Sequence, residues 1–334
     1  MAHFLLILHM LAQDIRLPAD FNERLTRITE QYVPEVHLTP QSGTTLVTVP
    51  PVAPLPVKRS STSAATLTAQ ADRAIVVDVS SGAVLFGKNQ DQPAPIASIT
   101  KLMVALVTLD KMDSLDQVLS VPREINDLEE LSTVVGLAPG EKISVRELLK
   151  GLLVASGNDA ALTLAHGLAG SEDEFVDWMN QKAERLGMTK THFVNSTGLD
   201  ARGGESTARE VAYLLIEASK VQRLRDLSEL STATVETENG SSYFVKSTDK
   251  LIGQTDLDIE LAKTGNEDEA GPCFALIASD GQQRIAVVVL NSPDRFGEAE
   301  RLVETALDTY RWADAVVGAN GGGDLKSEGS AFGG

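Results

Sequence analysis

The alternation of apolar and polar residues divides the chain into strand-like ends and a helical middle. Arg73 to Val79 and Ala83 to Phe86 are short β-branched runs separated by Ser80-Ser81-Gly82, which predicts a β-hairpin. Cys273 to Ala278 and Arg284 to Leu290 flank an Asp-Gly turn signal and predict a second hairpin. Because hairpins join antiparallel strands, the two regions should contribute to one antiparallel sheet.

The middle of the chain has the helical period. Ser144-x-x-Glu147 and Ser171-x-x-Glu174 are capping boxes, and each opens an amphipathic run. A last helix is predicted after Pro293, from about Asp294 to Ala315. Hairpins at both ends with helices between them favour the α+β class over a βαβ arrangement.

Both ends of the chain differ in composition from this body. Prolines between Val33 and Val57 and a Ser/Thr/Ala stretch after them predict that residues 1–69 are an N-terminal segment and linker. Residues 316–334 are predicted to be a Gly-rich disordered tail, which leaves residues 70–315 as one domain. The apolar stretch within residues 1–12 has a length that suits the core of an export signal. The signal is a weak one because no basic residue precedes the stretch, and a buried or fortuitous apolar segment is the alternative.

Charge and cysteine content exclude several classes of function. The chain has 29 Lys and Arg against 47 Asp and Glu, so its formal net charge is −18 and we expect no nucleic-acid partner. The single cysteine, Cys273, excludes a disulfide scaffold and a Cys-based zinc site. The sequence contains neither H-E-x-x-H nor a P-loop, and no metal or cofactor is expected.

Ser98-Ile99-Thr100-Lys101 is the first of three motifs that could carry chemistry. Ser98 precedes the apolar helix from Leu102 to Val107, so Lys101 should lie one turn on, on the same face. A lysine buried among apolar side chains can be neutral and take the serine proton. The alternative is an ordinary N-cap serine with a solvated lysine. A second Ser-x-x-Lys, Ser247 to Lys250, has polar neighbours and no such helix.

Two further motifs follow in the chain. Ser156-Gly157-Asn158 comes after the apolar end of the helix that begins at Ser144, and it could present a hydroxyl and an amide to a cleft or simply form a turn between helices. Lys263-Thr264-Gly265 ends a plausible strand, Ile259 to Ala262, where glycine would let a substrate backbone pair with the strand edge. A turn at the strand end is the alternative there.

In this order the three motifs resemble the set of the penicillin-binding proteins and class A β-lactamases, with Gly157 where that set has Asp. From about Ala71 to Trp312 the chain resembles the low-molecular-mass penicillin-binding proteins, which are serine-type D-alanyl-D-alanine carboxypeptidases. The segments that carry the resemblance are Ala97 to Met103, Ser156 to Ala160, Asn195 to Asp200, Ser206 to Arg209 and Asp294 to Phe296.

The resemblance implies a penicillin-binding, transpeptidase-like fold: an antiparallel sheet flanked by helices, with a helical subdomain. It implies that Ser98 attacks the bond between two D-alanines of a peptidoglycan stem peptide, forms an acyl-enzyme and releases D-alanine. Lys101 would be the general base and Ser156 the proton relay. β-Lactams should inhibit the enzyme by trapping Ser98. Because the substrate is the cell wall, the resemblance also implies an extracytoplasmic location, and the N-terminal segment could associate the protein with the membrane.

The remaining site residues are also implied by the resemblance. Asn158 would hold the substrate peptide, while Lys263, Thr264 and Gly265 would line the site toward the substrate carboxylate. Arg295 is a second candidate for binding that carboxylate. The backbone N–H groups of Ser98 and Asn266 would form the oxyanion hole.

The chain departs from the family after Lys263-Thr264-Gly265, where an aromatic residue or His and then Thr are usual. Here Asn266 is followed by Glu267-Asp268-Glu269, and carboxylates beside a carboxylate site are unfavourable unless they point away. This acidic run leaves a non-catalytic wall-binding relative open. An endopeptidase of cross-linked peptidoglycan also stays open, because the sequence does not separate it from the carboxypeptidase, and a β-lactamase is a further alternative. The β-lactamase is disfavoured because no E-x-x-L-N segment follows Asn158.

Overall fold

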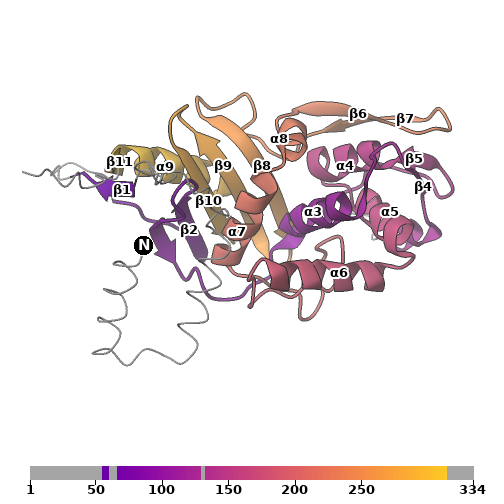
Figure 1. Cartoon of the computed structure of the whole chain (residues 1–334), viewed down its shortest axis with the longest axis horizontal. Coiled ribbons are helices and arrows are strands. Elements are labelled where there is room, and N and C mark those ends of the chain that lie inside the picture. Colours follow the sequence, from indigo (N-terminus) through magenta and orange to yellow (C-terminus); the bar gives the residue numbers. More distant parts are fainter. Residues whose placement is uncertain (1–54, 60–65, 129–131, 314–334) are drawn as a thin grey trace, which may run out of the picture. The chain divides into compact units, whose positions relative to one another are not determined.

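A computed structural model describes residues 55–59, 66–128 and 132–313 of the chain (Figure 1). Its centre is a five-stranded antiparallel sheet in the order β3-β2-β10-β9-β8. The strands are β2 (Arg73–Asp78), β3 (Val84–Lys88), β8 (Asp258–Glu267), β9 (Gly271–Ser279) and β10 (Arg284–Leu290). Both predicted hairpins are therefore present, and the strands from the beginning and the end of the predicted domain share one sheet.

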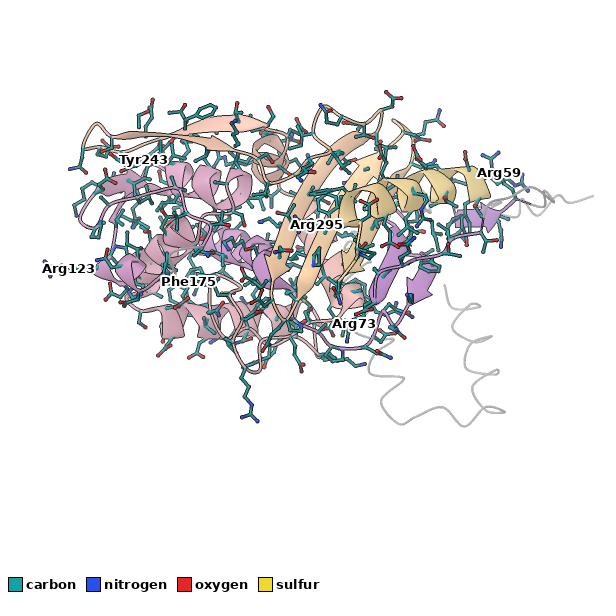
Figure 2. All side chains as sticks on the ribbon, turned by 180° about the vertical axis from the view of Figure 1, so that it is seen from behind. Arg59, Arg73, Arg123, Phe175, Tyr243 and Arg295 are labelled. Atoms are coloured by element: carbon teal, nitrogen blue, oxygen red, sulfur yellow. The ribbon has the colours of Figure 1, made fainter. Side chains whose placement is uncertain are left out.

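The sheet is buried on both faces, because alternate strand residues enter two different cores. Ile75 and Val77 of β2 pack with the helices of the first face, whereas Ala74 and Val76 pack on the second face. Helix α9 (Arg295–Thr309) covers that second face, as Figure 2 shows from behind. The α+β class predicted from the sequence is confirmed.

Helices on the first face form the helical subdomain (Figure 1). They are the 3₁₀ turns η1 (Ala97–Thr100) and η2 (Arg123–Asp127) and the helices α3 (Lys101–Lys111), α4 (Val145–Val154), α5 (Asn158–Ala169), α6 (Glu172–Arg185), α7 (Ala208–Ser219) and α8 (Gln222–Ser228). Ser144 and Ser171 cap α4 and α6 by accepting from the N–H groups of Glu147 and Glu174, as the capping boxes predict.

Three two-stranded ribbons complete the described structure. β4 (Val118–Ser120) pairs with β5 (Lys142–Ser144), β6 (Thr232–Glu236) with β7 (Ser242–Lys246), and β1 (Leu55–Lys58) with β11 (Tyr310–Ala313).

The β1–β11 ribbon corrects two expectations. Four residues of the predicted linker form a strand, and the last helix ends at Thr309 rather than near Ala315 because the following residues pair with β1. Residues 1–12, the expected export signal, and the tail at 316–334 lie outside the described residues.

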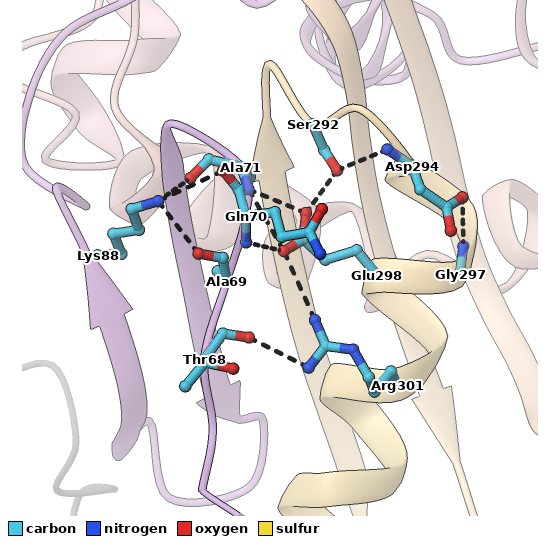
Figure 3. A network of polar contacts seen from close by, with 10 residues as sticks. All are labelled: Thr68, Ala69, Gln70, Ala71, Lys88, Ser292, Asp294, Gly297, Glu298 and Arg301. Atoms are coloured by element: carbon cyan, nitrogen blue, oxygen red, sulfur yellow. Dashed lines mark hydrogen bonds and ion pairs between the residues drawn. The ribbon is translucent and has the colours of Figure 1, made fainter.

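A buried carboxylate ties the chain before β2 to the start of α9 (Figure 3). Glu298 is 4% exposed and accepts hydrogen bonds from the N–H groups of Gln70 and Ala71 and from the Ser292 hydroxyl. Asp294 caps the helix by accepting from the Gly297 N–H at 3.2 Å. Since buried polar groups need partners, this network fixes the first turn of α9, which carries Arg295.

Candidate active site

The first predicted pair meets at the junction between η1 and α3. Ser98 lies in the 3₁₀ turn, one residue after Ala97, whose φ of +49° is in the left-handed region. Lys101 begins α3, and its Nζ lies 2.8 Å from Ser98 Oγ. The sequence places Ser98 in the first turn of the helix, and the structure corrects this to a strained 3₁₀ turn just before it. Strain of this kind is frequent at functional sites.

The surroundings of Lys101 suit a neutral amine. The side chain is fully buried, and Nζ donates to Asn158 Oδ1 at 2.5 Å and to the Thr197 carbonyl. A neutral amine has two N–H donors and one lone pair, so these two acceptors leave the lone pair for the Ser98 hydroxyl proton. Burial lowers the pKa of Lys101 to about 7, although the charges of Glu267 and Asp159 oppose the shift.

A second serine–lysine pair faces the first. Ser156 follows α4 with a φ of +60°, and its Oγ accepts from Lys263 Nζ at 2.8 Å. Lys263 is 1% exposed and also donates to the Thr264 carbonyl at 2.9 Å. Its burial, and then the nearby charge of Lys101, lower the pKa of Lys263 well below its ordinary value.

Exposure distinguishes the two hydroxyls. Ser156 is 4% exposed, whereas Ser98 is partly exposed and can be reached by a substrate. A nucleophile must approach the reacting carbon, while a hydroxyl that relays a proton needs only a hydrogen-bonded position next to it. The arrangement therefore favours Ser98 as the attacking group and Ser156 as its neighbour in proton transfer.

Asn158 holds Lys101 in place. Its Oδ1 accepts from Lys101, and its Nδ2 donates to Ser132 Oγ at 2.6 Å. The next residue, Asp159, orders the adjoining loop by accepting from three consecutive N–H groups at 2.8–2.9 Å, those of Val135, Gly136 and Leu137. Sequence reasoning missed Ser132, which lies in a loop with no periodic pattern. The expected contact between Asn158 and a substrate peptide stays a prediction.

Strand β8 runs past the nucleophile loop rather than ending at it. Lys263-Thr264-Gly265 lies inside β8, which continues to Glu267, so the expected strand end is corrected. A Cβ at Gly265 would lie 2.7 Å from the Ile96 carbonyl oxygen and 3.3 Å from the Ser98 backbone nitrogen. Glycine is therefore required here because β8 packs directly on the backbone that carries Ser98.

Gly265→Ala is expected to push β8 away from this loop. We expect a loss of about 1–3 kcal/mol in the free energy of unfolding. Acylation by a β-lactam should fall by roughly 100-fold, because a shift of about 1 Å misplaces the reacting groups. Thermal unfolding and acylation kinetics measure the two effects. Gly87→Ala, on the opposite edge strand, is the control because the three atoms nearest to its Cβ would belong to the flexible Gln90 side chain and not to the backbone. Equal effects of the two substitutions would contradict the interpretation.

The other expected binding residues lie along the same strand. Thr264 Oγ1 is 2.6 Å from Thr248 Oγ1, a contact that the polar neighbours of the second Ser-x-x-Lys segment do not predict. Asn266 is exposed and follows Gly265, so its backbone N–H lies on the strand that contacts the Ser98 loop.

Arg295 reaches β8 from the other face of the sheet. It starts α9, and its Nη1 donates to the Gly265 carbonyl at 2.6 Å (Figure 2). The guanidinium also lies 4.8 Å from the centre of the Phe296 ring. Arg295 therefore places a positive charge beside the strand that carries Lys263, close to where the substrate carboxylate is expected.

The three acidic residues after Asn266 do not share one orientation. Glu267 is the last residue of β8, and strand alternation puts it on the same face as Lys263 and Gly265. Asp268 and Glu269 are exposed in the turn to β9. Only Glu267 is therefore directed toward the reacting groups, and its charge raises the pKa of Lys101 against the effect of burial.

Glu267→Gln is expected to move the pH dependence of acylation to lower pH. Removing this negative charge destabilises the Lys101 ammonium, so the pKa of Lys101 falls below about 7 and the basic form is present in more acidic solution. We expect acylation by benzylpenicillin near pH 6 to be roughly two- to fivefold faster than in the unmodified protein. Asp268→Asn, in the exposed turn, is the matched control. A shift to higher pH, or none, would disprove the coupling.

Fold and site together define a serine hydrolase with a buried lysine in contact with the candidate nucleophile, in a sheet-and-helix fold of the transpeptidase kind. The family model for D-alanyl-D-alanine carboxypeptidases matches residues 59–294, and the chain belongs to this family, the low-molecular-mass penicillin-binding proteins. It is accordingly a serine-type peptidase.

Individual relatives agree with the family assignment. The chain is 35% identical over 267 residues to the D-alanyl-D-alanine endopeptidase of Pseudomonas aeruginosa, covering 79% of this chain and 81% of that protein. It is 36% identical over 218 residues to the D-alanyl-D-alanine carboxypeptidase DacB2 of Mycobacterium tuberculosis, covering 65% and 73%.

Solved structures show the same fold. The Streptomyces K15 DD-transpeptidase superposes with a TM-score of 0.69 at 26% identity, over 73% of this chain and 99% of that one. A D-alanyl-D-alanine carboxypeptidase from Mycobacterium tuberculosis gives a TM-score of 0.68 at 31% identity, over 75% and 96%. The fold expected from the resemblance is confirmed.

Proposed function

We propose that this protein cleaves the terminal D-alanine from peptidoglycan stem peptides through an acyl-enzyme on Ser98. The observation that carries the proposal is the contact between Ser98 and the buried Lys101, whose pKa of about 7 allows it to act as a base near neutral pH. Relatives named as D-alanyl-D-alanine carboxypeptidases support the choice of substrate.

The proposed reaction begins when Lys101 takes the Ser98 proton as Oγ attacks the carbonyl carbon between the two D-alanines. The backbone N–H groups of Ser98 and Asn266 stabilise the tetrahedral oxyanion. Ser156, hydrogen-bonded to Lys263, gives its hydroxyl proton to the departing D-alanine nitrogen and takes up the proton that Lys101 removed from Ser98, which leaves Lys101 neutral again. Water then hydrolyses the Ser98 ester and restores the hydroxyl.

The substrate carboxylate is assigned to the end of the site near Thr264. In this proposal Arg295 supplies positive charge, to which Lys263 adds in its protonated form, the Thr264 hydroxyl donates a hydrogen bond, and Gly265 keeps the strand close to Ser98. Asn158 orients Lys101 and borders the bound peptide. The proposed chemistry requires no metal or cofactor, and the described residues contain no cluster of potential metal ligands.

A reaction with benzylpenicillin tests the proposal. We expect a stable mass increase of one penicilloyl group, together with release of D-alanine from an N-acylated peptide that ends in D-Ala-D-Ala. Rapid turnover of a chromogenic cephalosporin would instead support a β-lactamase. Peptide binding with neither adduct nor D-alanine release would support a non-catalytic wall-binding protein.

Endopeptidase activity is the second candidate, because proteins named D-alanyl-D-alanine endopeptidase, from Pseudomonas aeruginosa and Escherichia coli, are each 35% identical to this chain. Comparing the rates on a cross-linked peptide dimer and on a D-Ala-D-Ala monomer separates the two activities. Faster cleavage of the dimer would support the endopeptidase.

Substrates of this kind place the proposed enzyme outside the cytoplasm, on the cell-wall side. The N-terminal segment would supply export and membrane association. Within residues 55–59, 66–128 and 132–313, the structure contains no helix that is long and apolar enough to cross a membrane. Fractionation of cells that produce the full chain tests the location.

A further inference from the structure

The second Ser-x-x-Lys segment lies against the strand that carries Lys263 and Thr264. Ser247 follows β7, and the next residue, Thr248, contacts Thr264 through their hydroxyl groups at 2.6 Å. The Thr248 N–H is also bonded to the Val154 carbonyl at the end of α4. The segment is therefore fixed both to the strand and to the helix that leads to Ser156.

Among the described residues, only one of the two carboxyl oxygens of Asp249, the next residue, has a hydrogen-bond partner. Its Oδ1 accepts from the Leu251 N–H at 2.9 Å. Its Oδ2 is buried and has no hydrogen-bond partner among the described residues. A buried ionised oxygen without a partner is costly, so this atom requires either a proton of its own or a partner that donates a hydrogen bond to it.

The basic groups that act electrostatically on Asp249 are Arg295 and Lys263, the two that are expected to lie near the substrate carboxylate. Arg295 interacts with it from α9 and Lys263 from β8, and both lower the pKa of the Asp249 carboxyl. Burial has the larger effect, and the pKa of Asp249 is raised above its ordinary value. The group is thus neutral over a wider pH range than an exposed aspartate.

We propose that Asp249 is a specificity-determining residue for the carboxylate end of the substrate, and this inference rests on the proposed function. In its ionised form Asp249 offsets the positive charge of Lys263 and Arg295 and opposes a bound carboxylate. In its protonated form it removes that repulsion and has an O–H available to donate a hydrogen bond. Anion recognition at the Thr264 end of the site should therefore depend on the charge of Asp249.

Two β-lactams that differ only in charge test the inference. Benzylpenicillin carries a carboxylate, whereas its methyl ester does not. The experiment measures the second-order rate constant for acylation by each compound between pH 5 and 9, in the unmodified protein and in Asp249→Asn. Asparagine keeps an oxygen that can accept from the Leu251 N–H but carries no charge.

Asp249→Asn should raise the rate constant for benzylpenicillin roughly tenfold at pH 8 while leaving that for the methyl ester unchanged. The difference between the two proteins should disappear only below the pKa of Asp249, which burial raises above its ordinary value, because the aspartate is then neutral as well. Removal of the Asp249 charge also lowers the pKa of Lys263, because that charge stabilises the Lys263 ammonium, so the gain measured at pH 8 is net of this opposing effect. Asp256→Asn, exposed on the same connection to β8, is the matched control and should match the unmodified protein at every pH.

Equal changes with both compounds would show a structural role for Asp249 and overturn the inference, as would no change with either. If Asp249→Asn fails to fold, the same comparison is made with Asp249→Ala, and equal changes with both compounds, or no change with either, would contradict the inference. A lack of adduct with both compounds in the unmodified protein would instead overturn the proposed function.

Discussion

Ser98→Ala should abolish the penicilloyl adduct and lower D-alanine release by at least roughly 10⁴-fold. The substitution removes the only atom that the proposed mechanism uses for attack, and it leaves Lys101, Ser156 and Lys263 in place. Because Ser98 is small and partly exposed, the thermal stability should change little. Intact mass after exposure to benzylpenicillin and a D-alanine assay measure the two losses.

The matched control for this substitution is Ser114→Ala, an exposed serine just beyond the other end of α3. It should form the adduct as the unmodified protein does. An adduct that persists in Ser98→Ala would assign the nucleophile to another residue. Peptide mapping would then test Ser156, the other serine that contacts a buried lysine.

The sheet and the main helices could be predicted because their local patterns are strong. The β-branched run of β2 and the Asp-Gly turn between β9 and β10 determine hairpins with little help from the rest of the chain. The β1–β11 ribbon could not be predicted, since Leu55 and Ala313 pair across almost the whole described chain. The sequence after Thr309 carries no local signal that separates a strand from further helix.

The site shows the same division between regular elements and loops. Lys101 and Lys263 lie on a helix and a strand at spacings that the motifs record, so their approach to Ser98 and Ser156 could be expected. The Thr197 carbonyl that receives a hydrogen bond from Lys101 is 96 residues away in the chain. A backbone acceptor in a loop has no side-chain signature, and only the folded structure reveals it.

The acidic segment after Gly265 shows what a family pattern alone cannot resolve. From the sequence, Glu267, Asp268 and Glu269 together oppose a carboxylate-binding site. The strand continues two residues beyond Gly265, and its alternation directs Glu267 inward while the turn exposes the other two. The effect on the site therefore depends on strand length and register, which the motif does not contain.

Lys101→Met should slow acylation of Ser98 by about 10²–10⁴-fold, the range expected for loss of a positioned general base. In the unmodified protein, acylation should accelerate as the pH rises through about 7, because Lys101 must lose its proton before it can accept one from Ser98. The variant should lack this rise. Methionine fills a similar volume without a buried amine, so the fold should persist.

The control for Lys101→Met is Lys111→Met, the exposed last residue of the same helix, which should keep both the rate and its pH dependence.

The pH dependence of the free energy of unfolding gives an independent test of the charge of Lys101. Since the pKa of Lys101 is lowered from 10.5 to about 7, the native protein binds fewer protons than the unfolded chain between these values, and its stability should rise with pH there. Lys101→Met should reduce this slope, leaving the part due to Lys263. An unchanged slope together with an unchanged rate would show that Lys101 remains charged and that another group takes the Ser98 proton.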